Sequence, residues 1–357
     1  MSRVFIIAEA GVNHNGDLNM AKQLIDVAAS SGADAVKFQT FIAEQVISRN
    51  APKAEYQTRE TGAFESQLEM IKKLEFNDKD HEVLIQYARS KGIEFLSTPF
   101  DLTSLNLLIK YGLRTIKIPS GEITNLNFLL KISQVAKKII LSTGMSTLSD
   151  IELALGVIAF GFLSKIDVVP KLEDFEKAFC SKVGRQALKE RVTILHCTTE
   201  YPAPYNEVNL NAMDTIAQAY GLSVGYSDHT RGIHISLAAV ARGAKVIEKH
   251  FTLNRNLPGP DHSASLEPNE LDSLIRQIRD IETAIGDAVK RPTESEWKNR
   301  IVARRSLVAS KPISKGELFT EENLSCKRPG NGISPLKYWE YLGQPSQFSY
   351  TVDELIK

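Results

Sequence analysis

VTILHCT (192–198), SVGYSDH (223–229) and VIEKHFT (246–252) share one pattern, a short apolar run that ends in polar or ionisable residues. Five more copies of the pattern precede them: VFIIAEAG (4–11), AVKFQT (35–40), EFLSTPF (94–100), TIKIPSG (115–121) and KIILSTG (138–144). Apolar runs of this length are typical of strands that are buried on both faces. Eight of them, separated by helical segments, predict an eight-stranded parallel barrel.

The segments between the runs carry helix signals. Asp17 can cap a helix after the first run, and Thr147 and Asp150 can form a capping box after the fifth. Gly92 and Gly112 stand where helices are expected to end. Because strands and helices alternate and crossovers are right-handed, the strands are expected to run parallel.

Two segments interrupt this alternation. Residues 43–77 form a long polar excursion after the second run, and we interpret them as a lid over the rim of the barrel. Residues 163–191 are charged and partly helical in pattern, and we interpret them as a surface elaboration.

The chain is expected to hold two domains. The last barrel helix is predicted over 270–285, where apolar residues recur at helical spacing. We therefore assign residues 1–287 to a barrel, 288–302 to a basic linker with a short helix, and 303–357 to a small domain of short strands and turns. That domain is too small to bury a large core alone, so we expect it to dock onto another surface.

Composition excludes several classes of function. The 357 residues include 43 Lys and Arg and 43 Asp and Glu, so there is no electrostatic reason to expect a nucleic-acid or membrane partner. No apolar run approaches the ~18 residues of a membrane span, and an acidic residue at position 9 comes too early for a secretory signal. Three cysteines without zinc or disulfide spacing favour a reducing, cytoplasmic location.

The polar ends of the eight runs are the candidate active site, because chemistry in such barrels takes place at the carboxyl ends of the strands. Ten residues are expected to meet there: Glu9, Lys37, Gln39, Ser97, Lys117, Ser120, Ser142, Asp228, His229 and His250.

Two histidines close consecutive runs, His229 in YSDHT and His250 in EKHFT. Neighbouring strands lie ~5 Å apart, so both imidazoles can bind one cation. Each could instead make only local hydrogen bonds. We favour a divalent metal, Mn²⁺ first and Mg²⁺ or Co²⁺ as alternatives, because imidazole with oxygen ligands suits these ions.

The second candidate set combines lysines with hydroxyl groups. Its members are Lys37, Lys117, Thr98, Ser120, Ser142 and Ser227. A buried lysine is costly unless an anion meets it, so two lysines with several hydroxyls indicate a ligand that carries phosphate and carboxylate. Internal ion pairs, Lys37 with Glu9 or Lys117 with Glu122, are one alternative, and a Schiff-base lysine is another. Glu9 is a candidate for orienting or deprotonating a water near the metal.

These motifs together resemble the sialic acid synthase family over nearly the whole chain. In order they read IIAEAGVNHNG, AVKFQTF, FLSTPFD, KIPSGE, ILSTGM, HCTTEYPAP, GYSDHT, EKHFTL, GPDH and KRPGNGISP. The resemblance implies a TIM barrel followed by a small β-rich SAF (antifreeze-like, β-clip) domain, in a domain-swapped homodimer. It implies a transferase that condenses phosphoenolpyruvate with an N-acetylated mannosamine-type sugar and releases phosphate.

The resemblance also assigns roles to residues. The metal ligands match His229 and His250. The phosphoenolpyruvate contacts match Lys37, Thr98, Lys117, Ser120, Ser142 and Ser227, and Thr199 stands where some members have asparagine. The sugar contacts match Gln39, Glu122, Tyr201 and Asp261, and Arg328 matches an arginine that reaches the N-acyl group across the dimer.

The family's mechanism fits this inventory. The metal polarises the sugar aldehyde, the phosphoenolpyruvate methylene attacks it, water adds at C2, and phosphate leaves by C–O cleavage. We favour N-acetylmannosamine as the sugar and N-acetylneuraminate as the product. The alternative is legionaminic acid synthesis from 2,4-diacetamido-2,4,6-trideoxymannose, with pseudaminic acid synthesis further behind. A non-catalytic sugar-binding protein would leave the lysines and histidines at the strand ends without a purpose.

Overall fold

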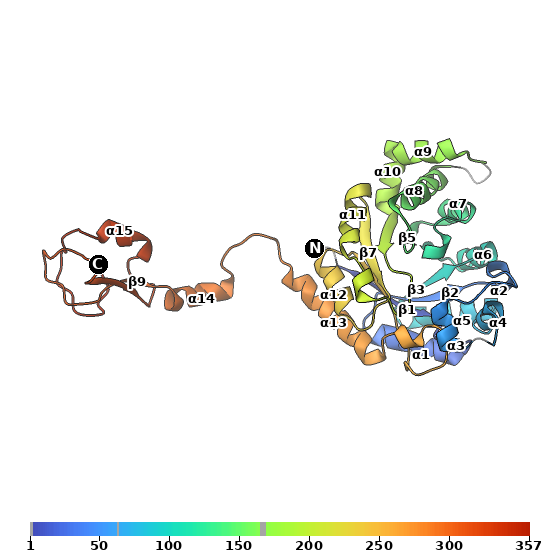
Figure 1. Ribbon diagram of the computed structural model, residues 1–357, viewed down its shortest axis with the longest axis horizontal. Helices are drawn as coiled ribbons and strands as arrows, with labels where there is room; N and C mark the ends of the chain where they lie inside the picture. Colours follow the sequence, from blue (N-terminus) through green and yellow to red (C-terminus); the bar gives the residue numbers. More distant parts are fainter. Residues whose placement is uncertain (1–2, 63, 165–168) are drawn as a thin grey trace. The chain divides into compact units, whose positions relative to one another are not determined.

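The computed structural model describes residues 3–62, 64–164 and 169–357 of the chain (Figure 1). The chain divides into two compact units, residues 1–286 and 287–357. In the described part of the chain, no helix is both long enough and apolar enough to span a lipid bilayer.

The first unit is built on eight parallel strands, as predicted. They are β1 (Phe5–Gly11), β2 (Ala35–Thr40), β3 (Glu94–Pro99), β4 (Thr115–Ile118), β5 (Lys138–Ser142), β6 (Val192–His196), β7 (Ser223–Asp228) and β8 (Val246–His250). Their hydrogen-bonded order is β3-β2-β1-β8-β7-β6-β5-β4. The end strands β3 and β4 are in contact, so the barrel is nearly closed.

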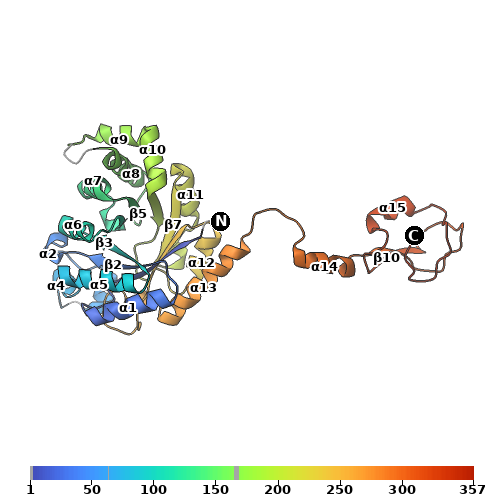
Figure 2. The ribbon, with the colours of Figure 1, turned by 180° about the vertical axis from the view of Figure 1, so that it is seen from behind.

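Helices surround the barrel on its outside (Figures 1 and 2). They are α1 (Leu18–Ser30), α5 (Asp78–Ser90), α6 (Leu102–Lys110), α7 (Leu126–Val135), α8 (Leu148–Leu163), α10 (Lys182–Arg191), α11 (Asn211–Tyr220), α12 (His234–Ala241) and α13 (Pro268–Ala284). The predicted start signals are confirmed, because the Asp17 carboxylate caps α1 and Thr147 with Asp150 forms a capping box on α8. Gly92 follows α5 with a φ of 71°, which glycine adopts without strain.

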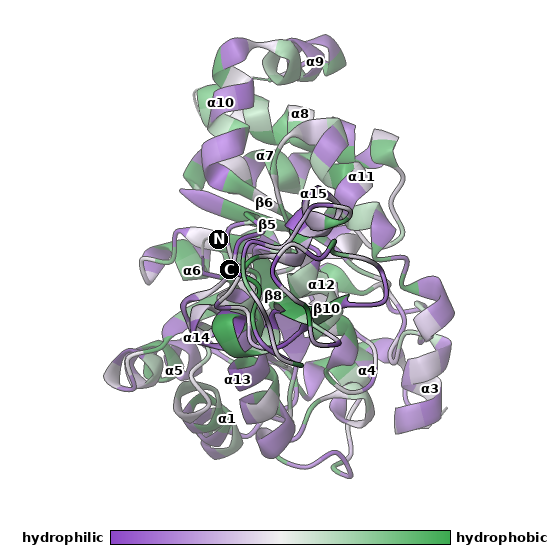
Figure 3. Ribbon diagram, turned by 90° about the vertical axis from the view of Figure 1, so that its left-hand side faces the viewer, coloured by the Kyte–Doolittle hydropathy of each residue, from purple (hydrophilic) through white to green (hydrophobic). Residues whose placement is uncertain are grey.

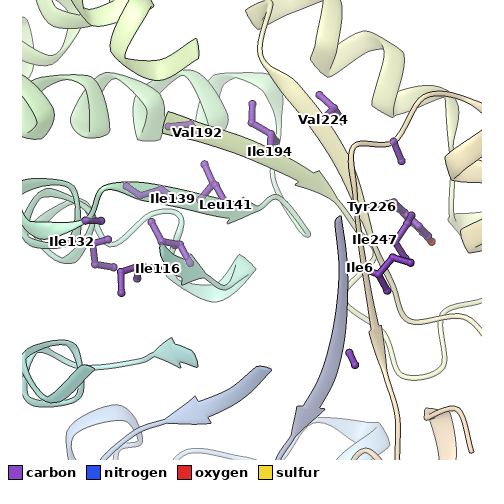
Figure 4. Packing of buried hydrophobic residues seen from close by; sticks show 14 of the residues in the cluster. Ile6, Ile116, Ile132, Ile139, Leu141, Val192, Ile194, Val224, Tyr226 and Ile247 are labelled. Carbon is purple, nitrogen blue, oxygen red and sulfur yellow. The ribbon is translucent and has the colours of Figure 1, made fainter. Parts of the chain in front are cut away.

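Each strand packs on both faces, which explains its continuous apolar run. The outer layer holds Ile6, Tyr226 and Ile247, which lie together between the sheet and the helices (Figure 4). An inner layer fills the barrel and consists of Ile7, Ala35, Leu96, Ile140, Leu195 and Val246. Figure 3 shows that the helices carry both hydrophilic and hydrophobic residues. The inner layer forms the apolar floor beneath the polar strand ends.

Residues 43–77 fold into three short helices, α2 (Ala43–Val46), α3 (Glu55–Thr61) and α4 (Gln67–Lys72). The Ala43 N–H donates to Glu75 at 3.0 Å, and Lys72 pairs with Glu44. Residues of this segment line the cavity described below, which agrees with the prediction that it covers the rim.

Residues 169–191 form α9 (Leu172–Cys180) and α10, which pack on α8 through Phe175 and Ala178 on the outside of the barrel (Figure 1). This is consistent with a surface elaboration. Part of the predicted insertion, 165–168, lies outside the described residues.

The second unit contains α14 (Glu294–Ala303), the antiparallel strands β9 (Ser306–Ala309) and β10 (Leu324–Lys327), and α15 (Tyr338–Tyr341). Its core is small and consists of Leu307, Ala309, Ile313, Phe319, Leu324, Tyr350 and Ile356. The short helix expected in the basic segment is α14.

Candidate active site

The carboxyl ends of the barrel strands open into a cavity of about 610 Å³. Every residue of the first unit to which the sequence analysis gave a role in the site lines it. They are Glu9, Lys37, Gln39, Thr98, Lys117, Ser120, Glu122, Ser142, Thr199, Tyr201, Ser227, His229, His250 and Asp261. The side chains come from all parts of the sequence between positions 9 and 261, and only the closure of the barrel brings them together.

Two of the expected strand-end residues do not reach this cavity. The Ser97 hydroxyl lies 2.6 Å from the Thr40 hydroxyl. Asp228 accepts from Ser236 at 2.6 Å and pairs with Lys249 at 3.0 Å. Including Ser97 and Asp228 in the site was therefore wrong. Side chains alternate across a strand, so the inward neighbours Thr98 and Ser227 line the cavity instead.

An ion-pair network joins four strands inside the barrel. Lys37 Nζ lies 2.7 Å from Glu9 and 3.5 Å from Glu248, and Lys117 Nζ lies 3.1 Å from Glu248. Lys37 also donates to Thr98 at 3.0 Å. The pairing of Lys37 with Glu9 was anticipated. The pairing of Lys117 with Glu122 was wrong, since Glu122 accepts from Asn125 and Lys117 reaches Glu248 instead.

The two carboxylates of this network differ in acidity. Burial raises the pKa of the Glu9 carboxyl to about 7, although the Lys37 ammonium acts in the opposite direction. Glu248 is equally buried, but Lys117 and Lys37 outweigh desolvation and hold its pKa below the ordinary value. Because the two pKa values differ, Glu248 can stay charged near neutral pH while Glu9 can accept a proton.

Glu248 also lines the cavity and is a candidate site residue that sequence reasoning missed. It is the acid two residues before His250. That spacing of two was itself the signal, because residues i and i+2 of a strand share one face. Ser227 donates to Glu248 at 2.7 Å, so the carboxylate has three cavity neighbours from three strands.

The histidines form a neutral pair whose ring centroids are 5.7 Å apart. The carbonyl oxygen of Thr198 accepts from His229 Nδ1 at 2.6 Å, so Nε2 carries the lone pair, and the Ser227 hydroxyl lies 3.4 Å from it. Burial lowers the pKa of His229 to about 4, and burial with the neighbouring His229 and Lys37 holds the pKa of His250 well below its usual value. His250 Nδ1 is buried without a hydrogen-bond partner among the described residues. A neutral imidazole is the form that binds a metal ion.

No group of three or more His, Cys, Asp and Glu in the described ranges is arranged to hold a metal ion. The pair would therefore supply two ligands, with the rest of the coordination from water or substrate oxygen. Catalytic metal sites likewise keep a coordination position open for water or substrate.

Hydroxyl groups gather around a glycine on the other side of the cavity. The Gly144 N–H donates to Ser120 Oγ at 3.0 Å. A Cβ at Gly144 would come within 2.1 Å of Thr199 Oγ1, so a larger residue there would displace the surrounding hydroxyls. The hydroxyls of Ser142 and Thr199 are buried and have no partner within the described residues. Such a cradle suits the oxygens of a bound anion.

Aromatic side chains connect the histidines to the rim. Tyr201 packs on His229 with a centroid distance of 4.2 Å, and Tyr56 of α3 packs on Tyr201 at 5.1 Å. Asp261 Oδ2 lies 3.9 Å from His250 Nδ1, and burial raises the pKa of this carboxyl to about 6.

Four of the other five histidines have structural surroundings. His81 bonds to Thr40, His196 to the Val208 carbonyl and His262 to Thr252, while His14 stacks on Phe76. None of these four lines the cavity.

Arg328 belongs to the second unit and is exposed there. Glu322, an acid close to it in sequence, pairs with Lys311 at 2.8 Å instead. Within the described ranges Arg328 has no carboxylate within ion-pair distance.

Comparison with known proteins agrees with the fold. Residues 24–290 match the NeuB family and residues 304–347 match the SAF domain. The chain is 56% identical to the N,N'-diacetyllegionaminic acid synthase of Campylobacter jejuni over the full length of both. It is 44% identical to the enzyme of that name from Legionella pneumophila, over 95% of this chain and 89% of the relative.

Among solved structures, the chain is similar to the N-acetylneuraminic acid (sialic acid) synthetase of Leptospira borgpetersenii in complex with citrate. The TM-score is 0.68 at 35% identity, covering 84% of this chain and 90% of that one. Human N-acetylneuraminate-9-phosphate synthase is 32% identical over 90% of this chain and 82% of its own length. The shared barrel, the strand-end site and these similarities show that the chain belongs to the NeuB family and ends in a SAF domain.

Proposed function

We propose that this protein is an N,N'-diacetyllegionaminic acid synthase, which condenses phosphoenolpyruvate with 2,4-diacetamido-2,4,6-trideoxymannose and releases phosphate. The observation that carries the choice of sugar is the 56% identity, over the full length of both chains, to an enzyme of that name. The sequence motifs alone favoured N-acetylneuraminate, but the neuraminate relatives are less similar, at 35% and 32% identity.

The cavity supports an anionic co-substrate. Lys37 and Lys117 line the cavity, and both pair with Glu248. The Ser142 and Thr199 hydroxyls have no hydrogen-bond partner among the described residues. We assign the phosphate and carboxylate of phosphoenolpyruvate to these groups and to Thr98, Ser120 and Ser227. Buried ammonium groups favour the dianionic ligand and offset the charge that develops as phosphate leaves.

Glu9 is positioned to handle a proton. Its pKa of about 7 lets it accept a proton at neutral pH, and Lys37 at 2.7 Å holds its carboxylate in place. We assign to Glu9 the orientation and deprotonation of the water that adds at C2. Glu248 stays ionised and positions the two lysines.

His229 and His250 are the proposed ligands of a divalent cation, Mn²⁺ first and Mg²⁺ or Co²⁺ as alternatives. When bound, such an ion supplies Lewis-acid polarisation of the sugar aldehyde. Gln39, Glu122, Tyr201 and Asp261 are the proposed contacts of the sugar.

The assembly is proposed to be a domain-swapped homodimer in which the partner's Arg328 completes the site. The support is the family resemblance together with an exposed guanidinium that has no ion-pair partner in the described ranges.

The test of function is a phosphate-release assay with phosphoenolpyruvate and a panel of sugars. We expect the diacetamido trideoxy sugar to be used with the highest kcat/KM and the product mass to be that of diacetyllegionaminic acid. Phosphoenolpyruvate labelled with ¹⁸O at the bridging oxygen should deliver the label to phosphate, since the C–O bond breaks. A higher kcat/KM for N-acetylmannosamine would assign the protein to neuraminate synthesis instead.

A further inference from the structure

One wall of the cavity is apolar, unlike the polar strand ends. Val12, Phe41 and Leu74 form a small hydrophobic cluster of their own, and Ile71 and Phe100 pack against it. Val12, Phe41, Ile71 and Phe100 line the cavity, together with Val46 and Ile47. The wall is thus a separate apolar layer above the polar base.

Part of the apolar surface of the wall is exposed rather than buried. Val46 is 37% exposed, and Ile47 and Ile71 are only partly buried, although all three line the cavity. Beneath them, Val12, Phe41 and Leu74 are nearly fully buried. An apolar lining of a mostly polar cavity is the part of a site that recognises an apolar group of the ligand.

The wall is held in place by polar contacts on its outer side. Glu75 accepts from the Ala43 N–H at 3.0 Å, Asp101 accepts from the Ile42 N–H at 2.9 Å, and Lys72 pairs with Glu44. The Lys72–Glu44 pair joins α2, which carries Val46, to α4, which carries Ile71, and the other two contacts hold the start of α2. The apolar surface is therefore built before a ligand arrives.

The wall and the reacting groups belong to different parts of the cavity lining. The histidine pair stands at the strand ends, and the aromatic contacts from His229 through Tyr201 to Tyr56 lead from it to the 43–77 segment. A six-carbon sugar whose aldehyde carbon C1 reacts near the histidines has C6 as the far end of its carbon chain. In the proposed sugar that end is a methyl group.

We propose that Val46, Ile47 and Ile71 bind the C6 methyl group and select a 6-deoxy sugar. This inference rests on the proposed function and adds the residues that set its specificity. A 6-hydroxyl against this wall would lose its hydrogen bonds to water and find no side-chain partner on the three residues. Discrimination by an apolar pocket against an added hydroxyl reaches about a hundredfold, so we expect a preference of ten- to a hundredfold.

The experiment compares two sugars that differ at one atom, 2,4-diacetamido-2,4,6-trideoxymannose and its 6-hydroxy analogue. Their kcat/KM ratio is measured for the wild type, for Val46→Thr and for Ile71→Thr. Val46→Thr keeps the shape of the side chain and adds a hydroxyl, and Val46 is exposed enough for the fold to tolerate it. Leu68→Thr is the matched control, because Leu68 lies on the same helix as Ile71 but does not line the cavity.

We expect both wall variants to reduce the ratio at least fivefold, mainly through the KM of the 6-deoxy sugar, while the KM of phosphoenolpyruvate and the Leu68→Thr ratio stay unchanged. An unchanged ratio in both wall variants would overturn the assignment. The assignment would also be overturned if the wall variants changed only the preference between sugars with a 4-acetamido and a 4-hydroxyl group, because the wall would then face C4.

The two proposals fail separately. If the wild type prefers N-acetylmannosamine, the proposed function fails, and the C6 assignment fails with it. If the wild type prefers the diacetamido trideoxy sugar and the variants keep the wild-type ratio, only the wall assignment fails. Thermal denaturation of each variant verifies that it is folded.

Discussion

Lys117 Nζ lies 3.1 Å from Glu248 Oε1 inside the barrel, and the side chains of both residues are only 5% exposed. Breaking a buried pair from one side leaves an uncompensated charge, which typically destabilises a protein by ~3–5 kcal/mol. The same relationship makes the site ready for an anion, because Glu248 holds two ammonium groups where phosphoenolpyruvate is proposed to bind.

Glu248→Gln is therefore expected to reduce the free energy of unfolding by about 3 kcal/mol, and phosphoenolpyruvate should restore more stability than it adds to the wild type. Urea denaturation with and without phosphoenolpyruvate measures both effects. Glu122→Gln is the control, since Glu122 contacts Asn125 and neither lysine. If phosphoenolpyruvate stabilises Glu248→Gln and the wild type equally, the two lysines do not contact phosphoenolpyruvate.

Lys117→Met is expected to weaken phosphoenolpyruvate binding by about 10- to 100-fold, because a charge-assisted hydrogen bond contributes ~1.5–3 kcal/mol. Sugar binding should change far less. Isothermal titration calorimetry with each ligand measures this, and Lys110→Met, which removes an exposed lysine on α6, is the control. An unchanged dissociation constant for phosphoenolpyruvate would remove Lys117 from the anion site.

His229→Ala and His250→Ala should each abolish turnover and its dependence on divalent cations without unfolding the protein. The reason is that both imidazoles are neutral and line the cavity. Turnover after chelation and after return of Mn²⁺, Mg²⁺ or Co²⁺ measures the effect. His234→Ala, at the exposed start of α12, is the control. Full activity of His250→Ala would disprove the metal assignment.

Inactive His250→Ala and inactive Arg328→Ala subunits should regain partial activity when they are unfolded and refolded together. In a swapped heterodimer, the intact barrel of one subunit would receive the partner's Arg328. A mixture of His250→Ala with Lys117→Met is the control, since neither barrel is then intact. If the first mixture stays inactive, Arg328 does not act across subunits.

Acid should destabilise the protein in part through His262. Burial lowers the pKa of His262 to about 4, below its value of about 6.5 in the unfolded chain, so the unfolded state binds more protons between these values. The stabilising contribution is present above pH 6.5 and is lost as the pH falls towards 4. His262→Gln, which can still bond to Thr252, should lower the slope of unfolding free energy against pH by up to ~1.4 kcal/mol per pH unit. An unchanged slope would contradict this account.

Local sequence determined the strands, the caps and the position of the polar groups along each strand. The apolar runs suffice because both faces of each barrel strand are buried, and Asp17 or Thr147 acts on backbone groups two or three residues away. From these patterns alone, the carboxyl ends of the strands could be identified as the site.

Tertiary structure alone decided which of these polar groups meet. Ser97 and Thr98 are adjacent in sequence, yet the pleat directs one to Thr40 and the other to Lys37. Glu248 becomes the partner of Lys117 only because barrel closure brings their strands to face one another across the interior. The apolar wall likewise depends on how 43–77 folds over the rim. Such contacts join residues far apart in sequence, so local periodicity carries no record of them.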